Sequence, residues 1–250
     1  MEWRDDPWSE VFDEDYLYFY EARLAAEPSE RETEQVLALL ELPPGATVLD
    51  APCGHGRIAN RLAARGLGVV GLDGNPGFLE LARRDAAESG VDVEYVHGDL
   101  RELPWSARFD AALNWYTSFG YFDDEGNQRV LSAYRRALKP GGRLLLEQIN
   151  RDSLLRQIPA GGSRLVSLTE RDDDLMIDRV HFDFLEGRSR TERIIVRDGR
   201  VRRVRFSLAQ RTLPELSSSL REAGFERITV HGVGGEPLGP DSRRMLIVAS

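Results

Sequence analysis

The sequence predicts an α/β fold in which a mostly parallel sheet carries helices on both faces. Thr47–Leu49 and Gly68–Leu72 are short apolar runs, typical of strands that are buried on both sides. The residues between them have helical spacing over 57–65 and end at Gly66, a common kind of helix terminus. A strand, a helix and a second strand in this order predict one unit of such a sheet.

Later segments continue the pattern. A helix expected over 125–138 precedes the fifth strand, and Thr212 with Glu215 forms a capping box that opens a last helix. Further strands are expected at 91–100, 109–114, 143–147, 225–230 and 245–249.

The turn after the first strand contains residues typical of a ligand-binding site. Gly54 and Gly56 lack side chains where the backbone turns sharply and a ligand comes close. Asp73 ends the second strand, where a carboxylate can accept hydrogen bonds from both hydroxyls of a ribose. The sequence therefore predicts a site for an adenosine-containing cofactor at the carboxyl edge of the sheet.

Two cofactors fit this turn. The spacing Gly54-x-Gly56-x-x-Ala59 with Asp73 also satisfies the dinucleotide fingerprint, so an NAD-dependent oxidoreductase is an alternative. Asp50 argues against it, because a carboxylate at the end of the first strand would repel a pyrophosphate and suits an ammonium group. Asp99, at the end of the third strand, can accept from an exocyclic amine.

With these features the chain resembles the class I S-adenosylmethionine-dependent methyltransferases. The motifs that carry the resemblance are LDAPCGHG (49–56), VVGLD (69–73), GDL (98–100), FDAALN (109–114) and LKPGG (138–142). The family has a Rossmann-like seven-stranded sheet and binds S-adenosyl-L-methionine. One departure is Pro52, which stands where the family usually has the first glycine of the turn and which removes an N–H.

The resemblance assigns parts of the cofactor to residues. It implies that the glycine turn faces the methionine part, that Asp73 with the adjacent Gly74 faces the ribose, and that Asp99 with Leu100 faces the adenine. Asn114, at the end of the fourth strand, is expected beside the reacting centre. The expected turn residues are Asp50, Ala51, Pro52, Gly54 and Gly56.

Residues 1–42 are expected to form a helical lid. In one interpretation Tyr16 or Tyr20 lines the acceptor pocket and Arg23 reaches the methionine carboxylate. In the other, the aromatic residues pack a helix onto the domain, as their spacing of three and four allows. A following helix is expected to begin at Ser29 as its N-cap.

Candidates for contact with the methyl acceptor follow the fourth and fifth strands. Tyr16, Asn114 and Glu147 are the catalytic candidates, although Glu147 could equally form a salt bridge. Aromatic walls suit a sulfonium, because a cation is attracted to ring faces. The expected wall residues, some of which would instead be structural, are Trp115, Tyr116, Phe119, Tyr121 and Phe122.

Residues 159–210 are expected to form an antiparallel insert of about four strands over the acceptor site, between the two parts of the cofactor domain (43–158 and 211–250). Asp198-Gly199 predicts a two-residue hairpin that brings Glu192 opposite Arg205. The many arginines of this segment form cross-strand ion pairs on a solvated face or, alternatively, a dimer surface or a site for an anionic substrate.

Composition limits the function classes. The net charge of −9 argues against broad affinity for nucleic acid, and no run of eighteen apolar residues predicts a membrane span. The acidic N-terminus lacks a signal-peptide core, so a cytoplasmic location is expected. Cys53 is the only cysteine and the four histidines are scattered, so we expect neither a disulfide framework nor a metal site.

The resulting hypothesis is a methyltransferase that moves the methyl group of S-adenosylmethionine to a nitrogen or oxygen of a small-molecule acceptor, with a homodimer left open. In-line displacement of this kind depends mainly on placement of the reactants. The alternatives are an NAD-dependent oxidoreductase, a non-catalytic cofactor-binding protein and an RNA methyltransferase.

Overall fold

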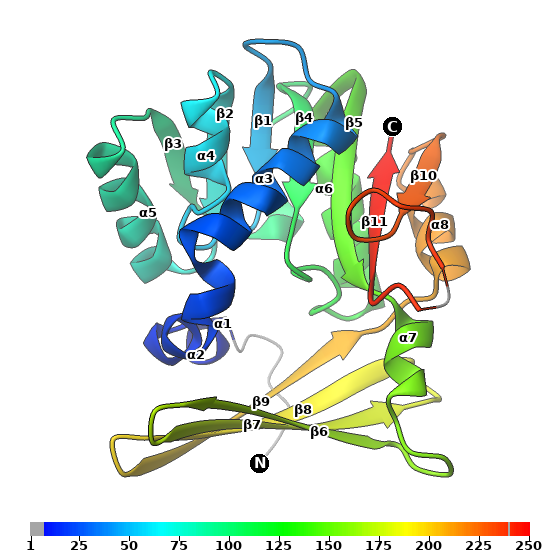
Figure 1. Cartoon of the computed structure of the whole chain (residues 1–250). Helices are drawn as coiled ribbons and strands as arrows, with labels where there is room; N and C mark the ends of the chain where they lie inside the picture. The colour runs from blue at the N-terminus through cyan, green and yellow to red at the C-terminus, as the bar shows by residue number, and fades with distance from the viewer. Residues whose placement is uncertain (1–7, 240) are drawn as a thin grey trace.

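A seven-stranded sheet forms the centre of the computed structural model, which describes residues 8–239 and 241–250. Its strand order is β10-β11-β5-β4-β1-β2-β3, and β11 runs in the direction opposite to the other six strands. The predicted Rossmann-like, mostly parallel sheet is confirmed (Figure 1). The strands are β1 (Thr47–Asp50), β2 (Gly68–Asp73), β3 (Val93–His97), β4 (Phe109–Asn114), β5 (Leu138–Ile149), β10 (Ile228–His231) and β11 (Arg244–Ala249).

Helices cover both faces of this sheet, as predicted. The helices α3 (Ala26–Leu40), α4 (Ala59–Ala64) and α5 (Pro76–Glu88) pack on one face, against residues such as Val48 and Leu113. The helices α6 (Asp124–Ala137) and α8 (Leu213–Glu222) pack on the other face, against Leu49 and Ile247. Neighbouring residues of one strand thus point into two separate apolar cores, because side chains alternate across a strand.

The chain reverses its direction of travel across the sheet beside β1. It passes from β1 to β2 and β3, continues through the 3₁₀ turn η1 (Leu100–Glu102), and returns to β4 on the other side of β1. Asp50 lies opposite Gly71 of β2 on one side and Leu113 of β4 on the other. The crevice at such a switch point is where open parallel sheets bind ligands.

A separate antiparallel sheet follows the short helix α7 (Arg151–Arg156) and lies below the main sheet in Figure 1. It consists of β6 (Arg164–Arg171), β7 (Asp174–Asp183), β8 (Arg188–Arg197) and β9 (Arg200–Ala209), in that order. The predicted four-stranded insert is confirmed. So is the hairpin, because Glu192 faces Arg205 and accepts a hydrogen bond from it at 2.9 Å.

The N-terminal helices α1 (Trp8–Val11) and α2 (Glu14–Leu24) lie between the two sheets (Figure 1). Ion pairs fasten α2 to the insert: Asp15 contacts Arg197 at 2.8 Å and Arg202 at 2.5 Å. On the other side, Asn75 Nδ2 donates to the carbonyl oxygen of Phe12 at 2.5 Å. The N-terminal helices are therefore held from both sides, while their role as a lid and the division into domains stay predictions. Residues 1–7 of the expected lid lie outside the described residues.

Several predicted boundaries were wrong. The fifth strand begins at 138 instead of 143, and β10 covers 228–231 instead of 225–230. The helix expected to begin at Ser29 begins at Ala26, because Pro28 fits the first turn, where its missing N–H is not needed. Ser29 is buried within the helix and donates its hydroxyl to Leu24 O at 3.0 Å. The third strand covers only 93–97 of the expected 91–100, because the chain turns into η1 at Leu100.

Within the described part of the chain, none of the helices is long and apolar enough to cross a membrane.

The capping box of α8 gives a test of the fold. Thr212 Oγ1 accepts from the Glu215 N–H, and the Glu215 carboxylate accepts from the Thr212 N–H at 2.7 Å. Thr212→Ala is expected to lower the free energy of unfolding by about 1 kcal/mol, measured by urea denaturation. Ser218→Ala, at an exposed position of the same helix, is the control and should not destabilise the protein.

Candidate cofactor and acceptor site

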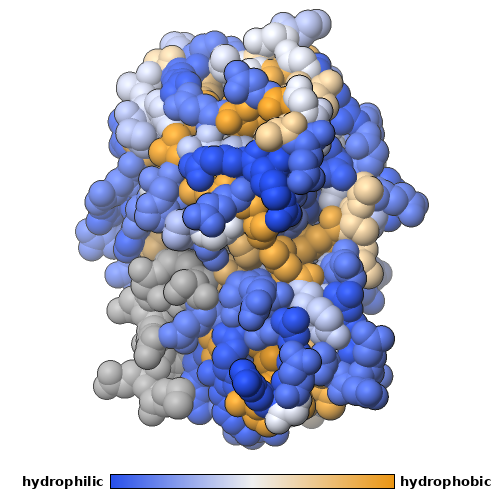
Figure 2. All heavy atoms as spheres, turned by 90° about the vertical axis from the view of Figure 1, so that its left-hand side faces the viewer, coloured by the Kyte–Doolittle hydropathy of each residue, from blue (hydrophilic) through white to orange (hydrophobic). Residues whose placement is uncertain are grey.

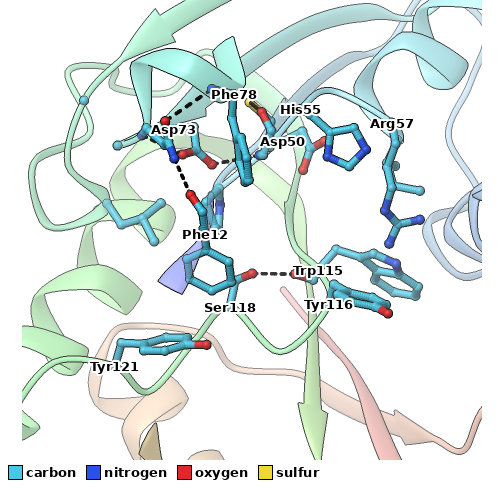
Figure 3. A pocket seen from close by; sticks show the side chains of 18 of the residues that line it. Phe12, Asp50, His55, Arg57, Asp73, Phe78, Trp115, Tyr116, Ser118 and Tyr121 are labelled. Carbon is cyan, nitrogen blue, oxygen red and sulfur yellow. Dashed lines mark hydrogen bonds between the residues drawn. The ribbon is translucent and has the colours of Figure 1, made fainter. Parts of the chain in front are cut away.

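A cavity of about 490 Å³ opens at the carboxyl ends of β1, β2 and β4, beneath the N-terminal helices. Hydrophobic residues gather on the surface at the waist between the main domain and the insert (Figure 2). In the close view, Trp115 and Tyr116 lie beside Arg57 at one end and Tyr121 lies toward the other (Figure 3). The polar lining includes Tyr16, Asp50, His55, Arg57, Asp73, Asn75, His97, Asp99, Tyr116, Ser118 and Tyr121.

The two glycines of the turn are required for different reasons. Gly54 has a φ of +54° and lines the cavity, and a Cβ atom there would meet only Phe78, at 3.9 Å. Gly56 has a φ of +79°, but its Cβ would lie 2.3 Å from the hydroxyl of Tyr95 and 2.8 Å from Ala82. Gly54 thus leaves space on the ligand side, whereas Gly56 allows the turn to pack on the protein interior.

Asp73 is held at the end of β2 by backbone donors. Its Oδ2 accepts from Gly54 N–H at 2.7 Å and its Oδ1 accepts from Asn75 N–H at 2.8 Å. Burial raises the pKa of this carboxyl, although these two hydrogen bonds act in the opposite direction. Each oxygen keeps a further lone pair for a donor in the cavity.

Asp50 is a buried carboxylate that reaches the cavity. Only 2% of the residue is exposed, and among the described residues no salt bridge pairs it with a basic side chain. Burial raises its pKa to about 7, and the nearby Asp73 adds to the shift. A cation placed here would stabilise the ionised form, so the site has the charge that an ammonium or sulfonium requires.

Asp99 and Leu100 line the cavity at the end of β3. The Arg101 guanidinium binds both oxygens of Asp99, at 2.5 to 3.0 Å, and lowers the pKa of that carboxyl. Asp99 is therefore ionised, and much of its hydrogen-bonding capacity is already used. Its predicted contact with an exocyclic amine stays a prediction.

Stacked aromatic rings of α2 form one side of the cavity. Tyr16 lines the cavity and stacks on Tyr20 at 4.8 Å between ring centroids. Arg193 of the insert lies 3.3 Å from the Tyr20 hydroxyl and forms a buried pair with Asp178 at 2.8 Å. The insert therefore positions Tyr16 through Tyr20, without itself lining the cavity.

The comparisons with known proteins agree with this geometry. The methyltransferase domain family matches residues 48–142. The cypemycin N-terminal methyltransferase of a Streptomyces species is 30% identical over 216 residues, which cover 82% of either chain. The chain belongs to the class I S-adenosylmethionine-dependent methyltransferases. It spans about half the length of several other curated relatives that it matches.

Solved structures share the fold of this methyltransferase. The CcbJ methyltransferase from Streptomyces caelestis superimposes with a TM-score of 0.76 at 21% identity, and 88% of each chain is covered. The S-adenosylmethionine-bound amino pentose methyltransferase CalS10 from Micromonospora echinaspora has a TM-score of 0.66 at 20% identity, with 95% of this chain and 97% of that one covered.

The cofactor of this methyltransferase is S-adenosyl-L-methionine, and the residues present fit it. Asp50 supplies a negative charge inside the cavity, Asp73 presents two fixed acceptors, and Gly54 leaves room for close approach. Pro52 also lines the cavity, and the turn keeps its backbone contacts through Cys53 N–H, which donates to Leu72 O at 2.9 Å. The family match therefore favours this cofactor over NAD.

Several predicted site residues lie outside the lining. Ala51 is buried beneath the turn, and its carbonyl accepts from the Tyr134 hydroxyl and, at 3.5 Å, from Asn114 Nδ2. Asn114 is fully buried and also donates to Tyr134. These contacts hold the carboxyl end of β1 in place beneath the glycine turn. Asn114 itself does not line the cavity.

Glu147, Tyr20 and Arg23 are also not part of the lining. Glu147 forms a salt bridge with Arg244 and accepts from the Tyr116 N–H at 2.5 Å, so it fixes the backbone of the loop after β4. Arg23 packs over the Tyr20 ring at 5.2 Å. Phe119, expected in the wall, is part of the apolar core. The catalytic and binding roles of these residues stay predictions.

Sequence reasoning missed several residues of the lining. Arg57 forms an ion pair with Glu32 at 2.5 Å, and Glu32 accepts from Trp115 Nε1 at 2.7 Å, so α3 is tied to the aromatic wall. Burial lowers the pKa of His55 to about 4, which keeps its ring neutral at physiological pH. Both residues stand in or next to the glycine turn, and that position was the available signal. Phe78, from the first turn of α5, gave no comparable signal.

No cluster of side chains suited to a metal ion occurs among residues 8–239 and 241–250.

The surroundings of Gly56 and Gly66 predict unequal costs for two matched substitutions. Gly66→Ala, at a φ of +81° with no atom within 4 Å, is expected to cost about 1–2 kcal/mol of backbone strain. Gly56→Ala should cost a further 1–3 kcal/mol or so, because the new methyl group overlaps Tyr95 and Ala82. Equal destabilisation of both variants in thermal unfolding would contradict this packing role.

Cofactor binding by this methyltransferase is expected to weaken below about pH 7. The free Asp50 carboxyl has a pKa of about 7, and a bound cation lowers it, so binding releases a proton. Affinity should fall roughly tenfold per pH unit between the two pKa values. Isothermal titration calorimetry in buffers of different ionisation enthalpy measures the released proton. Asp50→Asn is the control, which should bind weakly and without this proton release.

Proposed function

We propose that this small-molecule methyltransferase acts on a neutral amine nitrogen. The observation that carries the proposal is the chemistry of the lining. Its carboxylates, Asp50, Asp73 and Asp99, all lie on strand ends assigned to the cofactor. The acceptor side presents phenol hydroxyls, and a neutral amine is a good nucleophile without a base, whereas a hydroxyl becomes one only after losing its proton.

The phenols and His55 are poor bases. Burial raises the pKa of Tyr16 and Tyr121, so both phenols stay protonated. The neutral His55 has a pKa of about 4 and is a weak acceptor for a proton. His97 is the other histidine of the described lining, and its Nε2 contacts the Gly74 carbonyl at 3.1 Å, beside the residues assigned to the ribose. On the acceptor side, the phenols and His55 therefore lack the basicity needed to ionise an alcohol or phenol.

S-adenosylmethionine supplies a reactive methyl group on a sulfonium when it is bound. In the proposed site, Asp50 holds the ammonium of the methionine part, Asp73 the ribose, and Asp99 with Leu100 the adenine. Tyr16 and Tyr121 orient the acceptor amine through their hydroxyls, and Phe12, Phe78 and Trp115 exclude water. Alignment of the amine in such a dry site supplies most of the rate acceleration.

A relative supports the choice of nitrogen. The curated relative that matches over 82% of its length is named as an N-terminal methyltransferase, so its name places the methyl group on an amine. The proposal extends that chemistry to this chain without fixing the identity of the acceptor.

The acceptor's own ionisation should control the pH dependence. With S-adenosylmethionine saturating, kcat/KM should rise with pH up to the pKa of the acceptor amine, because only the neutral amine reacts. Release of S-adenosylhomocysteine is measured for two amines of different pKa. The midpoint is expected to move with the amine, and a fixed midpoint for both would indicate a protein base instead.

Matched acceptors test the choice of atom. Pairs of compounds that differ only in an amine or a hydroxyl are compared, with product mass as the readout. Tyr16→Phe and Tyr121→Phe should lower kcat/KM for the amine by roughly tenfold each, as expected for one lost hydrogen bond. Methylation of the hydroxyl partner alone would overturn the proposal.

A further inference from the structure

The two edge strands of the insert sheet differ in their charges. Its edge strand β9 carries several arginines and contacts α1, because Arg202 Nη1 donates to Glu10 O at 3.0 Å. The other edge strand, β6, contacts α2 at its last residue, where Arg171 Nη1 donates to Tyr18 O at 2.5 Å. It pairs with β7 through a regular register without a bulge, and no other strand of the described chain pairs with its outer edge. Residues 165–169 carry no charge. Natural proteins usually blunt such an edge with charges, proline or bulges.

Apolar side chains stand exposed on this edge. Val166 is 63% exposed and Leu168 is 55% exposed, and they lie on the same face of β6 because side chains alternate along a strand. Arg164 and Glu170 share that face at either end of the pair and are exposed. The strand therefore presents a basic residue, two apolar residues and an acidic residue in sequence.

The backbone groups of the same four residues point away from the sheet. Phe182 N–H donates to Ser163 O at 2.8 Å, and Arg164 is paired with His181, so Ser163 and Phe182 face each other as a hydrogen-bonded pair. In an antiparallel ladder such pairs alternate. The N–H and C=O groups of residues 164, 166, 168 and 170 are thus directed outward, where they can form a second ladder.

We propose that β6 pairs antiparallel with β6 of a second copy of this chain, about a two-fold axis at Ser167. This pairing places Arg164 opposite the partner's Glu170 and Val166 opposite the partner's Leu168, and the reverse contacts follow by symmetry. Two ion pairs thereby flank one apolar cluster, and every outward backbone group from 164 to 170 finds a partner. The two insert sheets become one continuous sheet.

Shifted registers lack this complementarity. An axis at Val166 would place Arg164 opposite the partner's Leu168, and an axis at Leu168 would place Val166 opposite the partner's Glu170. Both arrangements bury a charge against an apolar side chain, which is unfavourable without a partner of opposite charge. The axis at Ser167 satisfies both the charges and the apolar residues.

Charge reversal tests the interface and its register together. Sedimentation equilibrium of the full chain over a range of concentrations is expected to give twice the monomer mass for the natural protein. Arg164→Glu and Glu170→Arg should each lose the dimer, because like charges then face each other at both ends. The double variant Arg164→Glu with Glu170→Arg should regain it. A monomeric natural protein, or single variants that stay dimeric, would overturn the proposal.

Two further variants control for misfolding and for other interfaces. Val166→Pro removes an N–H that points away from β7, so the monomer should fold and keep its melting temperature while the dimer is lost. Val201→Asp alters an exposed apolar residue, 64% exposed, on the opposite edge strand and should remain dimeric. A monomeric Val201→Asp protein would place the interface elsewhere.

A cysteine on the axis gives a direct measure of register. Ser167→Cys brings two thiols directly opposite each other, at a Cβ separation of about 4.5–5.5 Å, which a disulfide can span after a small adjustment. Mild oxidation should give a covalent dimer on a non-reducing gel. Thr169→Cys, which faces the partner's Leu165, should not, and the native Cys53 is buried. Cross-linking through 169 but not through 167 would contradict the proposed axis.

Discussion

The carboxylate of Asp73 is the interaction on which the site depends. It joins three separate segments, because it accepts from the turn at Gly54 N–H and from Asn75 N–H at the start of α5. Asn75 in turn caps α5 through its Oδ1 and holds Phe12 of the lid through its Nδ2. The end of β2 thus sets the position of the cofactor turn, of one helix and of the N-terminal segment. Asp73, predicted from the sequence as a cofactor contact, therefore also stabilises the local structure.

Charges of the insert hold the N-terminal segment from its other side. Asp13 and Asp15 of the N-terminal segment bind Arg197 and Arg202 of the insert, and Arg193 with Asp178 supports Tyr20 from within the same sheet. Several arginines of the insert are therefore used to fasten α2 or to pair with Glu192 on the outer face. This arrangement explains why an acidic protein concentrates basic residues in one small sheet. The insert therefore supports the acceptor side of the cavity without lining it.

Burial separates the roles of the carboxylates. Asp50 is buried and forms no salt bridge within the described part of the chain, and burial raises its pKa, whereas Asp99 is bound by Arg101 and its pKa is lowered. Asp50 therefore responds to a bound cation, and Asp99 holds a constant charge. The same residue type, at the ends of two strands in one sheet, has different roles because Asp99 forms a salt bridge with a guanidinium, whereas burial dominates at Asp50.

The sequence by itself determined the mostly parallel sheet, the insert and a site for an adenosine-containing cofactor, because these depend on local patterns: apolar runs, glycine turns and acidic strand ends. Asp50, Gly54 and Asp73 reached the cavity as predicted. Asn114 and Glu147 did not, because their side chains bind Tyr134 and Arg244, partners 20 and 97 residues away that no local pattern reveals. Only the tertiary structure decided that Gly56 serves packing and that His55 and Arg57 line the cavity. Which side of a turn faces a ligand depends on what packs against its other side, and that is fixed by contacts between distant segments.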